Sequence, residues 1–331
     1  SGGTMILKRK IYKKLLEWKN ECQGKKALLI EGARRIGKST ICEEFGKNEY
    51  ESYLLIDFAK KDKEVEGYFE KYLNDLDTFF MLLQTHLGIK LTERNSLIIF
   101  DEVQMFPQAR AAIKYLVADG RYDYIETGSL ISIRENVKNI VIPSEERNIN
   151  MYPLDFEEFA IALEEDLLVE YIKKCFEKRE PLERSMHNQA MLLFHQYMLV
   201  GGMPMPVVAF IESKKDFTEP DKEKRDILKL YREDIMKIDA KYRSKVLAIY
   251  DQIPGFLSQH EKRVVFKKLQ DGSYADQYEE TFFWLSDSMI SNECFLCNDP
   301  NVGLSLNETR SYVKCYICLL YTSPSPRDGA T

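Results

Sequence analysis

A short apolar run that leads directly into a glycine-bounded loop is the feature of this sequence that most restricts its fold. Residues 26–31, Lys-Ala-Leu-Leu-Ile-Glu, have the length and composition of a buried strand. Residues 32–40, Gly-Ala-Arg-Arg-Ile-Gly-Lys-Ser-Thr, satisfy the pattern G-x-x-x-x-G-K-[ST] in full, and we expect a helix from about Lys38 to Lys47. A strand, a loop and a helix in this order indicate a parallel α/β sheet.

The residue types in this loop are those that phosphate binding requires. Gly32 and Gly37 let the backbone turn its N–H groups inward at a β-phosphate. Lys38 is expected to bridge the β- and γ-phosphate oxygens, and the Ser39 hydroxyl to bind Mg²⁺. The alternative is a glycine-containing turn before a surface helix, but the strand–loop–helix context favours ATP binding. The predicted nucleotide-binding residues are Gly32, Ala33, Arg34, Arg35, Ile36, Gly37, Lys38, Ser39 and Thr40.

A second motif, residues 97–102, is an apolar strand that ends in two carboxylates, Leu-Ile-Ile-Phe-Asp-Glu. A continuous hydrophobic run is typical of a buried parallel strand, and ligands bind at the carboxyl ends of such strands. We therefore expect Asp101 to hold Mg²⁺ through water beside Ser39, and Glu102 to orient and polarise the attacking water. Alone, the pattern fits a strand that meets a charged turn equally well. Its position after a phosphate loop favours catalysis.

The rest of the first 150 residues alternates between strand and helix patterns. Strands are predicted at residues 53–57 and 122–127, and helices at 65–87 and 107–118. This alternation predicts a parallel, doubly wound sheet. Thr127 and Ser129 end the last strand with hydroxyls where a γ-phosphate sensor would lie. The alternative role, capping a helix at residues 130–136, is compatible with sensing.

At this point the motifs resemble a known family. The phosphate loop, the Asp-Glu-Val-Gln strand end and Thr-Gly-Ser are followed by Met-Tyr-Pro-Leu-Asp-Phe-Glu-Glu-Phe at 151–159 and by Tyr-Met-Leu-Val-Gly-Gly-Met-Pro at 197–204. Leu-Tyr-Arg-Glu-Asp-Ile-Met-Lys follows at 230–237. Over about residues 5–318 this order resembles prokaryotic AAA+ ATPases that carry a C-terminal domain of unknown function.

The resemblance implies an α/β fold, with a parallel doubly wound P-loop core, an α-helical lid and a C-terminal winged-helix-like module. The expected boundaries are 5–153 for the core, 154–243 for the lid and 244–318 for the module. Some relatives continue into a nuclease-like region, which this chain is expected to lack. We expect residues 319–331 to be a non-native, disordered tail, because they are rich in proline and serine, and residues 1–3 to be a linker.

The resemblance also suggests two sites outside the phosphate loop. Gly202 and Pro204 resemble a Gly-x-Pro element that related ATPases place near the adenine, although Gly-Gly before proline is also an ordinary helix stop. Arg147 lies where many relatives carry a Gly-Arg pair, and an arginine there would reach a neighbour's γ-phosphate in an oligomer. Glu146 replaces that glycine here, which favours a solvated surface arginine.

The C-terminal third has the element order of a winged helix, with helices predicted at 245–258, 262–269 and 274–290 and strands at 293–297 and 312–318. The third helix of a winged helix normally enters the DNA major groove. Here it is acidic, and no Lys or Arg occurs between Lys268 and Arg310. Direct DNA binding is therefore disfavoured, and a protein partner or an intramolecular contact is favoured. The acidic residues concerned are Asp276, Glu279, Glu280 and Asp287.

Two Cys-x-x-Cys pairs in this region have the spacing of a zinc ribbon. They are Cys294 with Cys297 and Cys315 with Cys318, separated by residues 298–314. Neither pair is followed by the glycine common in zinc knuckles, and both lie on predicted strands. Cysteine is often a small buried hydrophobe, so core cysteines are the favoured interpretation and zinc the alternative.

Composition excludes several classes of protein. Against 53 Asp and Glu the chain has 47 Lys and Arg, a net charge of −6 that argues against wholesale nucleic-acid binding. No apolar stretch reaches the roughly 20 residues of a spanning helix, and no secretory signal follows Met5. We therefore expect a cytoplasmic protein without a membrane segment.

The functional prediction is Mg²⁺-dependent ATP binding and hydrolysis that moves the lid against the core. The alternative of a different class is a nucleotide-dependent switch or scaffold, which hydrolyses slowly and regulates a protein partner. A metabolic kinase is a weaker third hypothesis, because nothing marks an acceptor site for a second small molecule.

Overall fold

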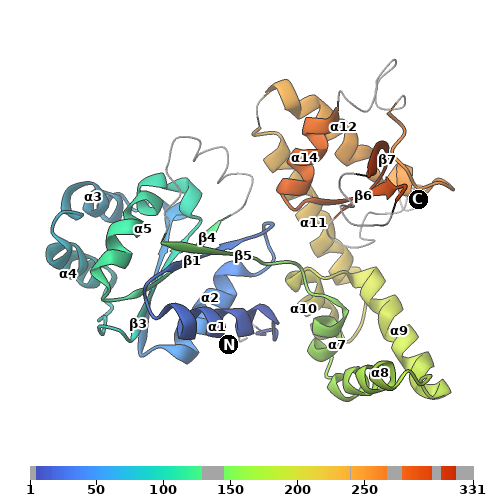
Figure 1. Ribbon diagram of the computed structural model, residues 1–331, viewed down its shortest axis with the longest axis horizontal. Coiled ribbons are helices and arrows are strands. Elements are labelled where there is room, and N and C mark those ends of the chain that lie inside the picture. The colour runs from blue at the N-terminus through green and yellow to red at the C-terminus, as the bar shows by residue number, and fades with distance from the viewer. Residues whose placement is uncertain (1–4, 129–144, 239, 267–277, 300–306, 318–331) are drawn as a thin grey trace. The chain divides into compact units, whose positions relative to one another are not determined.

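The computed structural model describes residues 5–128, 145–238, 240–266, 278–299 and 307–317 (Figure 1). The chain divides into two compact units. Residues 8–152 form the nucleotide unit, and residues 1–7 with 153–331 form the second unit. No helix in the described part of the chain is long and apolar enough to cross a membrane.

The nucleotide unit is built on a five-stranded sheet in the order β2-β3-β4-β1-β5, in which every pair of neighbours is parallel. The predicted parallel α/β sheet is thus confirmed. The fifth strand lies at an edge and is formed by residues just before the Met-Tyr-Pro sequence. The strands are β1 (Ala27–Glu31), β2 (Ser52–Asp57), β3 (Ser96–Asp101), β4 (Asp123–Gly128) and β5 (Glu146–Asn150).

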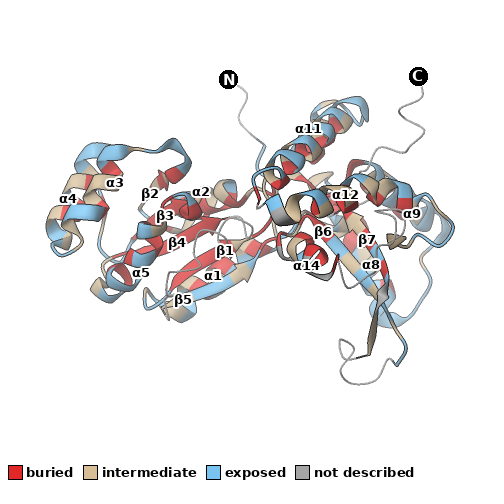
Figure 2. Ribbon diagram, turned by 90° about the horizontal axis from the view of Figure 1, so that it is seen from above, coloured by how far each residue is buried: buried red, intermediate tan, exposed pale blue. Residues whose placement is uncertain are grey.

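In the described part of this unit, five helices flank the sheet. One apolar cluster joins α3, α4 and α5 to alternate residues of the strands, including Leu29, Ile98 and Phe100. The intervening strand residues, such as Leu28 and Ile99, are also fully buried and face the side on which α2 packs. Figure 2 shows these strands as buried ribbon between helices with exposed outer faces. The helices are α1 (Ile11–Cys22), α2 (Lys38–Glu49), α3 (Lys63–Tyr72), α4 (Leu76–Leu87) and α5 (Pro107–Asp119).

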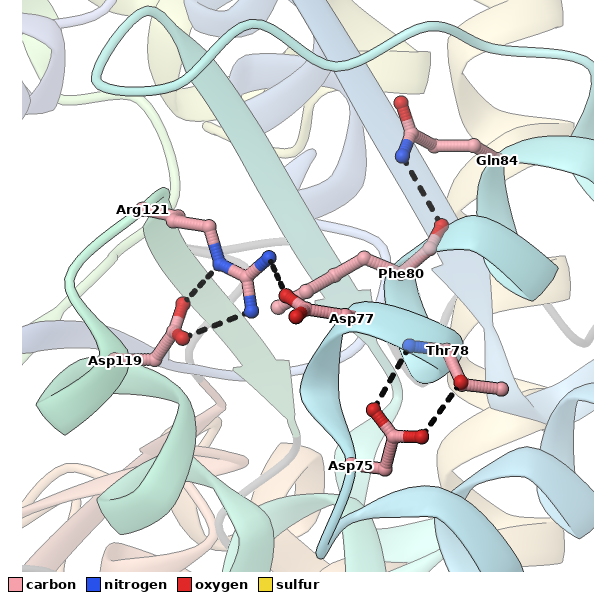
Figure 3. A network of polar contacts seen from close by, with 7 residues as sticks. All are labelled: Asp75, Asp77, Thr78, Phe80, Gln84, Asp119 and Arg121. Atoms are coloured by element: carbon pink, nitrogen blue, oxygen red, sulfur yellow. Dashed lines mark hydrogen bonds and ion pairs between the residues drawn. The ribbon is translucent and has the colours of Figure 1, made fainter.

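The single helix predicted over residues 65–87 is in fact two helices, α3 and α4. The carboxylate of Asp75 caps α4 by accepting the Thr78 N–H at 3.2 Å and the Thr78 hydroxyl at 2.6 Å (Figure 3). Arg121, which precedes β4, binds Asp119 with two hydrogen bonds of 2.8 and 2.9 Å and Asp77 with one of 2.7 Å. These contacts fix the start of α4 to the segment between α5 and β4.

The described residues of the second unit form helices up to residue 257, which are followed by one further helix and a short antiparallel sheet. Phe159, Val200 and Phe210 lie in the core of its first four helices. The helices are α7 (Phe156–Ala162), α8 (Asp166–Lys178), α9 (Arg184–Val200), α10 (Pro204–Glu212), α11 (Thr218–Ile235), α12 (Ala240–Leu257) and α14 (Glu279–Asp287), and the strands are β6 (Ser291–Cys297) and β7 (Glu308–Ile317).

The predicted C-terminal hairpin is present as the β6–β7 pair, with an irregularity between Phe295 and Leu296. The helix predicted from Lys262 is not formed at its start. Residues 262–265 are not helical, and Val264 instead donates its N–H to the Val313 carbonyl of β7 at 2.9 Å. Phe266 is helical, and the last residues of that predicted helix, 267–269, lie outside the described residues, so the winged-helix arrangement stays a prediction.

Candidate nucleotide-binding site

The carboxyl ends of the parallel strands bring the predicted site residues to one edge of the sheet. Asp57 lies opposite Asp101 in the β2–β3 register, and Glu31 lies opposite Gly128 in the β1–β4 register. The phosphate loop leaves β1 at this edge and enters α2. The phosphate loop therefore lies at the carboxyl ends of the parallel strands, where ligands of open α/β sheets bind.

The two loop glycines are required for different reasons. Gly37 has a φ of 90°, in the left-handed region that glycine adopts without a steric penalty. A Cβ on Gly32 would lie 2.4 Å from the Met151 carbonyl oxygen and 2.5 Å from Cδ1 of Ile36, so only glycine fits between the loop and the end of β5. The loop itself is well packed, because Ala33 and Ile36 are buried.

The Lys38 side chain folds back onto the phosphate loop. Its ammonium donates to the carbonyl oxygens of Gly32 at 2.9 Å and Ala33 at 2.8 Å, and the residue is only 6% exposed. Burial lowers the pKa of Lys38 to about 8, and the nearby carboxylates of Glu102 and Asp101 oppose that fall. The side chain is therefore still mostly charged at neutral pH.

Two other predicted site residues, Ser39 and Thr127, contact Asp101 from different elements. The Ser39 hydroxyl of α2 lies 2.8 Å from both carboxylate oxygens of Asp101 on β3. The Thr127 hydroxyl of β4 donates to Asp101 Oδ1 and accepts the Glu102 N–H at 3.3 Å. The structure thus brings the predicted magnesium pair, Ser39 and Asp101, into direct contact and adds Thr127 to it.

Glu102 turns the chain sharply away from β3. Its φ of 54° is left-handed, and it begins the short 3₁₀ helix η2 (Val103–Met105). The Glu102 carboxylate accepts a hydrogen bond from the Gln104 side-chain amide. The sequence patterns assigned no role to Gln104, and the one signal for it is a polar residue two positions after Glu102.

A second missed residue, Arg9, holds the phosphate loop from outside. Its guanidinium donates to the Ile36 carbonyl at 3.0 Å and to the Tyr152 carbonyl at 2.6 Å. Both acceptors are backbone atoms, so nothing in the sequence around Arg9 indicates the contact. Of the other predicted loop residues, Arg35 and Thr40 are exposed, and the positive charge of Arg34 contributes to the lowered pKa of Lys38.

The structure does not place three predicted residues relative to this cluster. Ser129 lies outside the described residues. Gly202 and Pro204 belong to the second unit, where a Cβ on Gly202 would lie 2.2 Å from the Leu154 carbonyl oxygen and Pro204 is the first residue of α10. The Leu154 N–H also donates to the Gly202 carbonyl at 2.6 Å. This close backbone approach explains the glycine within its own unit, and its contact with a nucleotide stays a prediction.

Arg147 on β5 forms a surface ion pair with Glu21 of α1, with Nη1 2.6 Å from Oε2. This pairing agrees with the surface role that the sequence favoured over an arginine finger. Elsewhere in the sheet, Glu126 of β4 is fully buried near the ion pair between Arg110 and Glu146, whose atoms lie 3.0 Å apart. Burial, and secondarily the Glu146 charge, raises the pKa of Glu126 well above its ordinary value.

The cysteine pairs do not converge in the described part of the chain. Cys294 lies opposite Lys314 and Cys315 opposite Glu293, so the two cysteines point to opposite faces of the β6–β7 sheet. Cys294 is exposed and Cys315 is buried, and Cys318 lies outside the described residues. No group of three or more metal-ligating side chains occurs among the described residues.

Comparison with known proteins supports the same fold. Residues 24–160 match a family model described as an AAA domain, and residues 191–318 match one described as a domain of unknown function (DUF8612). The parallel sheet with its flanking helices, together with the first match, defines an α/β AAA+ P-loop fold. No curated protein matches the chain.

Several solved structures resemble the chain distantly. The Aeropyrum pernix Orc1 protein in complex with DNA has 8% identity and a TM-score of 0.31, over 96% of this chain and 91% of that one. Domain III of the Thermotoga maritima replication initiation protein DnaA has 15% identity and a TM-score of 0.34, over 72% and 90%. A Pyrococcus horikoshii Signal Transduction ATPase with Numerous Domains has 12% identity and a TM-score of 0.36, over 97% and 42%.

Proposed function

We propose that the nucleotide unit binds and hydrolyses ATP with Mg²⁺. The observation that carries this proposal is the contact between the Ser39 hydroxyl and the Asp101 carboxylate, 2.8 Å apart, at the end of a phosphate loop. A hydroxyl and a carboxylate are hard oxygen donors, and Mg²⁺ in phosphate sites takes one or two such ligands and keeps several waters. Ser39 and Asp101 would hold the ion, which supplies charge neutralisation between the β- and γ-phosphates.

The loop provides the other half of the site. Lys38 donates to two loop carbonyls, and ATP phosphate oxygens would be stronger acceptors for the same ammonium because they are charged. The amide groups at the start of α2 and its helix dipole would bind the same phosphates. Arg34, near Lys38, adds a second positive charge.

Glu102 is the proposed base that orients the attacking water, and Thr127 the proposed γ-phosphate sensor. Thr127 is suited to this role because one hydroxyl contacts both the Asp101 carboxylate and the Glu102 N–H. Ser129 remains a proposed second sensor. We also retain the proposal that Gly202 and Pro204 contact the nucleotide and that hydrolysis moves the helical lid.

The test is ATP hydrolysis and fluorescent ATP-analogue binding by the full chain. Lys38→Ala should abolish binding, whereas Glu102→Gln should bind ATP and keep only a small residual turnover. Lys47→Ala, an exposed lysine in the last turn of the same helix, is the matched control and should behave as wild type. A Glu102→Gln protein that hydrolyses ATP normally would remove Glu102 from its role, and wild type that binds but hydrolyses very slowly would favour the switch.

We propose that the C-terminal module binds a protein partner, because the outer face of its sheet carries exposed apolar and aromatic side chains. Outward residues of β6 and β7 include Leu296, 47% exposed, and Tyr312, 48% exposed, where alternation would predict polar residues. They line a pocket of about 510 Å³ together with Arg263 and Lys314. Arg263 lies over the Tyr312 ring at 4.7 Å and pairs with Glu261, while Lys314 is exposed.

An apolar floor beside cationic groups fits an apolar side chain flanked by carboxylates, so the proposed occupant is an acidic segment of a protein partner. Duplex DNA is disfavoured, because its binding depends on many phosphate contacts and this face offers few cations. Selection from a random dodecapeptide library should enrich apolar residues next to Asp or Glu. Binding of the enriched peptides should be lost in Lys314→Glu but not in Lys178→Glu, an exposed lysine at the end of α8. Failure to enrich such peptides, or tighter binding of a duplex oligonucleotide, would overturn the proposal.

A further inference from the structure

We infer that Gln104 is a positioning residue for Glu102, an inference that rests on the proposed hydrolysis. The Gln104 side-chain amide donates to Oε2 of Glu102, two residues earlier in the chain. Gln104 is only 4% exposed, although it lies at the polar edge of the sheet. Most buried side-chain amides are hydrogen-bonded, and the Gln104 amide directs its donor at the proposed base.

The backbone around the pair leaves little freedom. Glu102 is left-handed, a conformation that a non-glycine residue adopts only when its surroundings impose it. Val103, the next residue, is fully buried in the core beneath α5. The Met105 N–H donates to the Glu102 carbonyl at 2.9 Å and the Phe106 N–H to the Val103 carbonyl at 3.1 Å, which closes the short helix. This turn directs the Gln104 side chain back toward the Glu102 carboxylate.

The chemistry of the donor suits the role. An amide N–H is neutral, so it can fix the orientation of a carboxylate without forming a competing salt bridge. The hydrogen bond engages Oε2, and no hydrogen bond to Oε1 of Glu102 is formed in the described part of the chain. The bond to Oε2 thus fixes the orientation in which the carboxylate would be presented to a water molecule, as a general base requires.

The competing explanation is that Gln104 only fills space next to the core. Gln104→Leu preserves most of the volume and removes the donor, and Gln104→Glu preserves the shape and replaces the donor with an acceptor. We expect Gln104→Leu to lower kcat by roughly 10- to 100-fold while ATP-analogue affinity changes by less than about threefold. In Gln104→Glu the second carboxylate repels Glu102 and the donor is lost, so kcat should fall at least as far as in Gln104→Leu.

A double mutant tests whether Gln104 affects turnover through Glu102. If Gln104 acts through Glu102, Gln104→Leu combined with Glu102→Gln should be no slower than Glu102→Gln alone. Wild-type turnover in Gln104→Leu, or an additive loss in the double mutant, would overturn the inference and leave the proposed hydrolysis intact. Absence of turnover in wild type would overturn both, and the wild-type measurement alone distinguishes the two failures. Circular dichroism and thermal unfolding of each variant establish that the comparison is between folded proteins.

Discussion

The Thr127 hydroxyl on β4 donates its hydrogen to the Asp101 carboxylate on β3, so the ends of two adjacent strands are joined through the proposed magnesium ligand. Thr127→Val keeps the shape and removes this hydroxyl. Because hydrogen bonds to charged groups contribute about 1.5–3 kcal/mol, we expect turnover to fall by roughly 10- to 100-fold. Steady-state ATP hydrolysis measures the loss, and Thr127→Ser should restore most of the rate. A Thr127→Val protein as active as wild type would exclude a role for the hydroxyl.

Ser39→Ala should raise the Mg²⁺ concentration that gives half-maximal turnover. The hydroxyl contacts both Asp101 oxygens, so its loss removes a proposed ligand and the group that orients the other. Loss of such a group typically costs about 10- to 100-fold in metal affinity. Titration of ATP hydrolysis with Mg²⁺ measures the change, and Ser39→Thr, which keeps a hydroxyl, should titrate like wild type. An unchanged Mg²⁺ requirement in Ser39→Ala would argue against the assignment.

Gly202→Ala should destabilise the second unit. Its added methyl group would lie 2.2 Å from the Leu154 carbonyl oxygen, and the hydrogen bond from the Leu154 N–H to the Gly202 carbonyl holds the two backbone segments together. Overpacking of this kind costs about 1–3 kcal/mol. The control is Gly255→Ala in α12 of the same unit, where the added Cβ meets nothing within 4 Å. Chemical denaturation compares the two, and equal stability of both variants would contradict the packing argument.

The buried Glu126 should make stability depend on pH. Its folded pKa is raised above its unfolded value, so the folded state holds a proton that the unfolded state releases above about pH 4.5. The contribution of Glu126 to stability is therefore fully present below the unfolded pKa and falls as the pH rises toward the folded one. Arg110 and Glu146 are the charged neighbours. Glu126→Gln should flatten the decline between pH 5 and 8 in urea unfolding, and an unchanged slope would contradict this assignment.

His86 should titrate above its ordinary pKa. Its ring nitrogens lie 2.8 Å from Asp62 Oδ2 and 3.0 Å from Glu64 Oε2, and the hydrogen bond to Asp62 is the main cause of the raised pKa. The link between α3 and α4 is then complete below the unfolded value of about 6.5 and weakens as the pH rises through the folded value. NMR titration of the His86 ring measures this pKa directly. Asp62→Asn should lower it, and a wild-type His86 that titrates below 6.5 would refute the contact.

The parts of the fold that were predictable are those that a local pattern determines. The apolar strand, the phosphate loop and the helix that begins at Lys38 form one continuous signal, and the carboxylates Asp101 and Glu102 follow an equally clear strand. Parallel strands end at a common edge, so the meeting of Ser39 with Asp101 follows from the topology alone.

The features that sequence patterns did not predict depend on side-chain direction or on contacts with distant backbone atoms. The break between α3 and α4 is produced by a cap at Asp75, within a pattern that reads as one amphipathic helix. The edge strand β5 is polar and gave no strand signal. Arg9 binds carbonyl groups, which every residue has. Strand register, rather than spacing, decided that Cys294 and Cys315 face apart.

The anchoring of the phosphate loop to the end of β5 has a mechanical consequence. Arg9 joins the Ile36 carbonyl to the Tyr152 carbonyl, and Gly32 lies against the Met151 carbonyl. Directly after Tyr152, at Pro153, the chain leaves the nucleotide unit and enters the second unit. A rearrangement of the loop around phosphate would therefore displace the residues from which the chain passes into the second unit. This connection is the polypeptide chain itself. A change in the loop could therefore reach the second unit without a separate interface between the units.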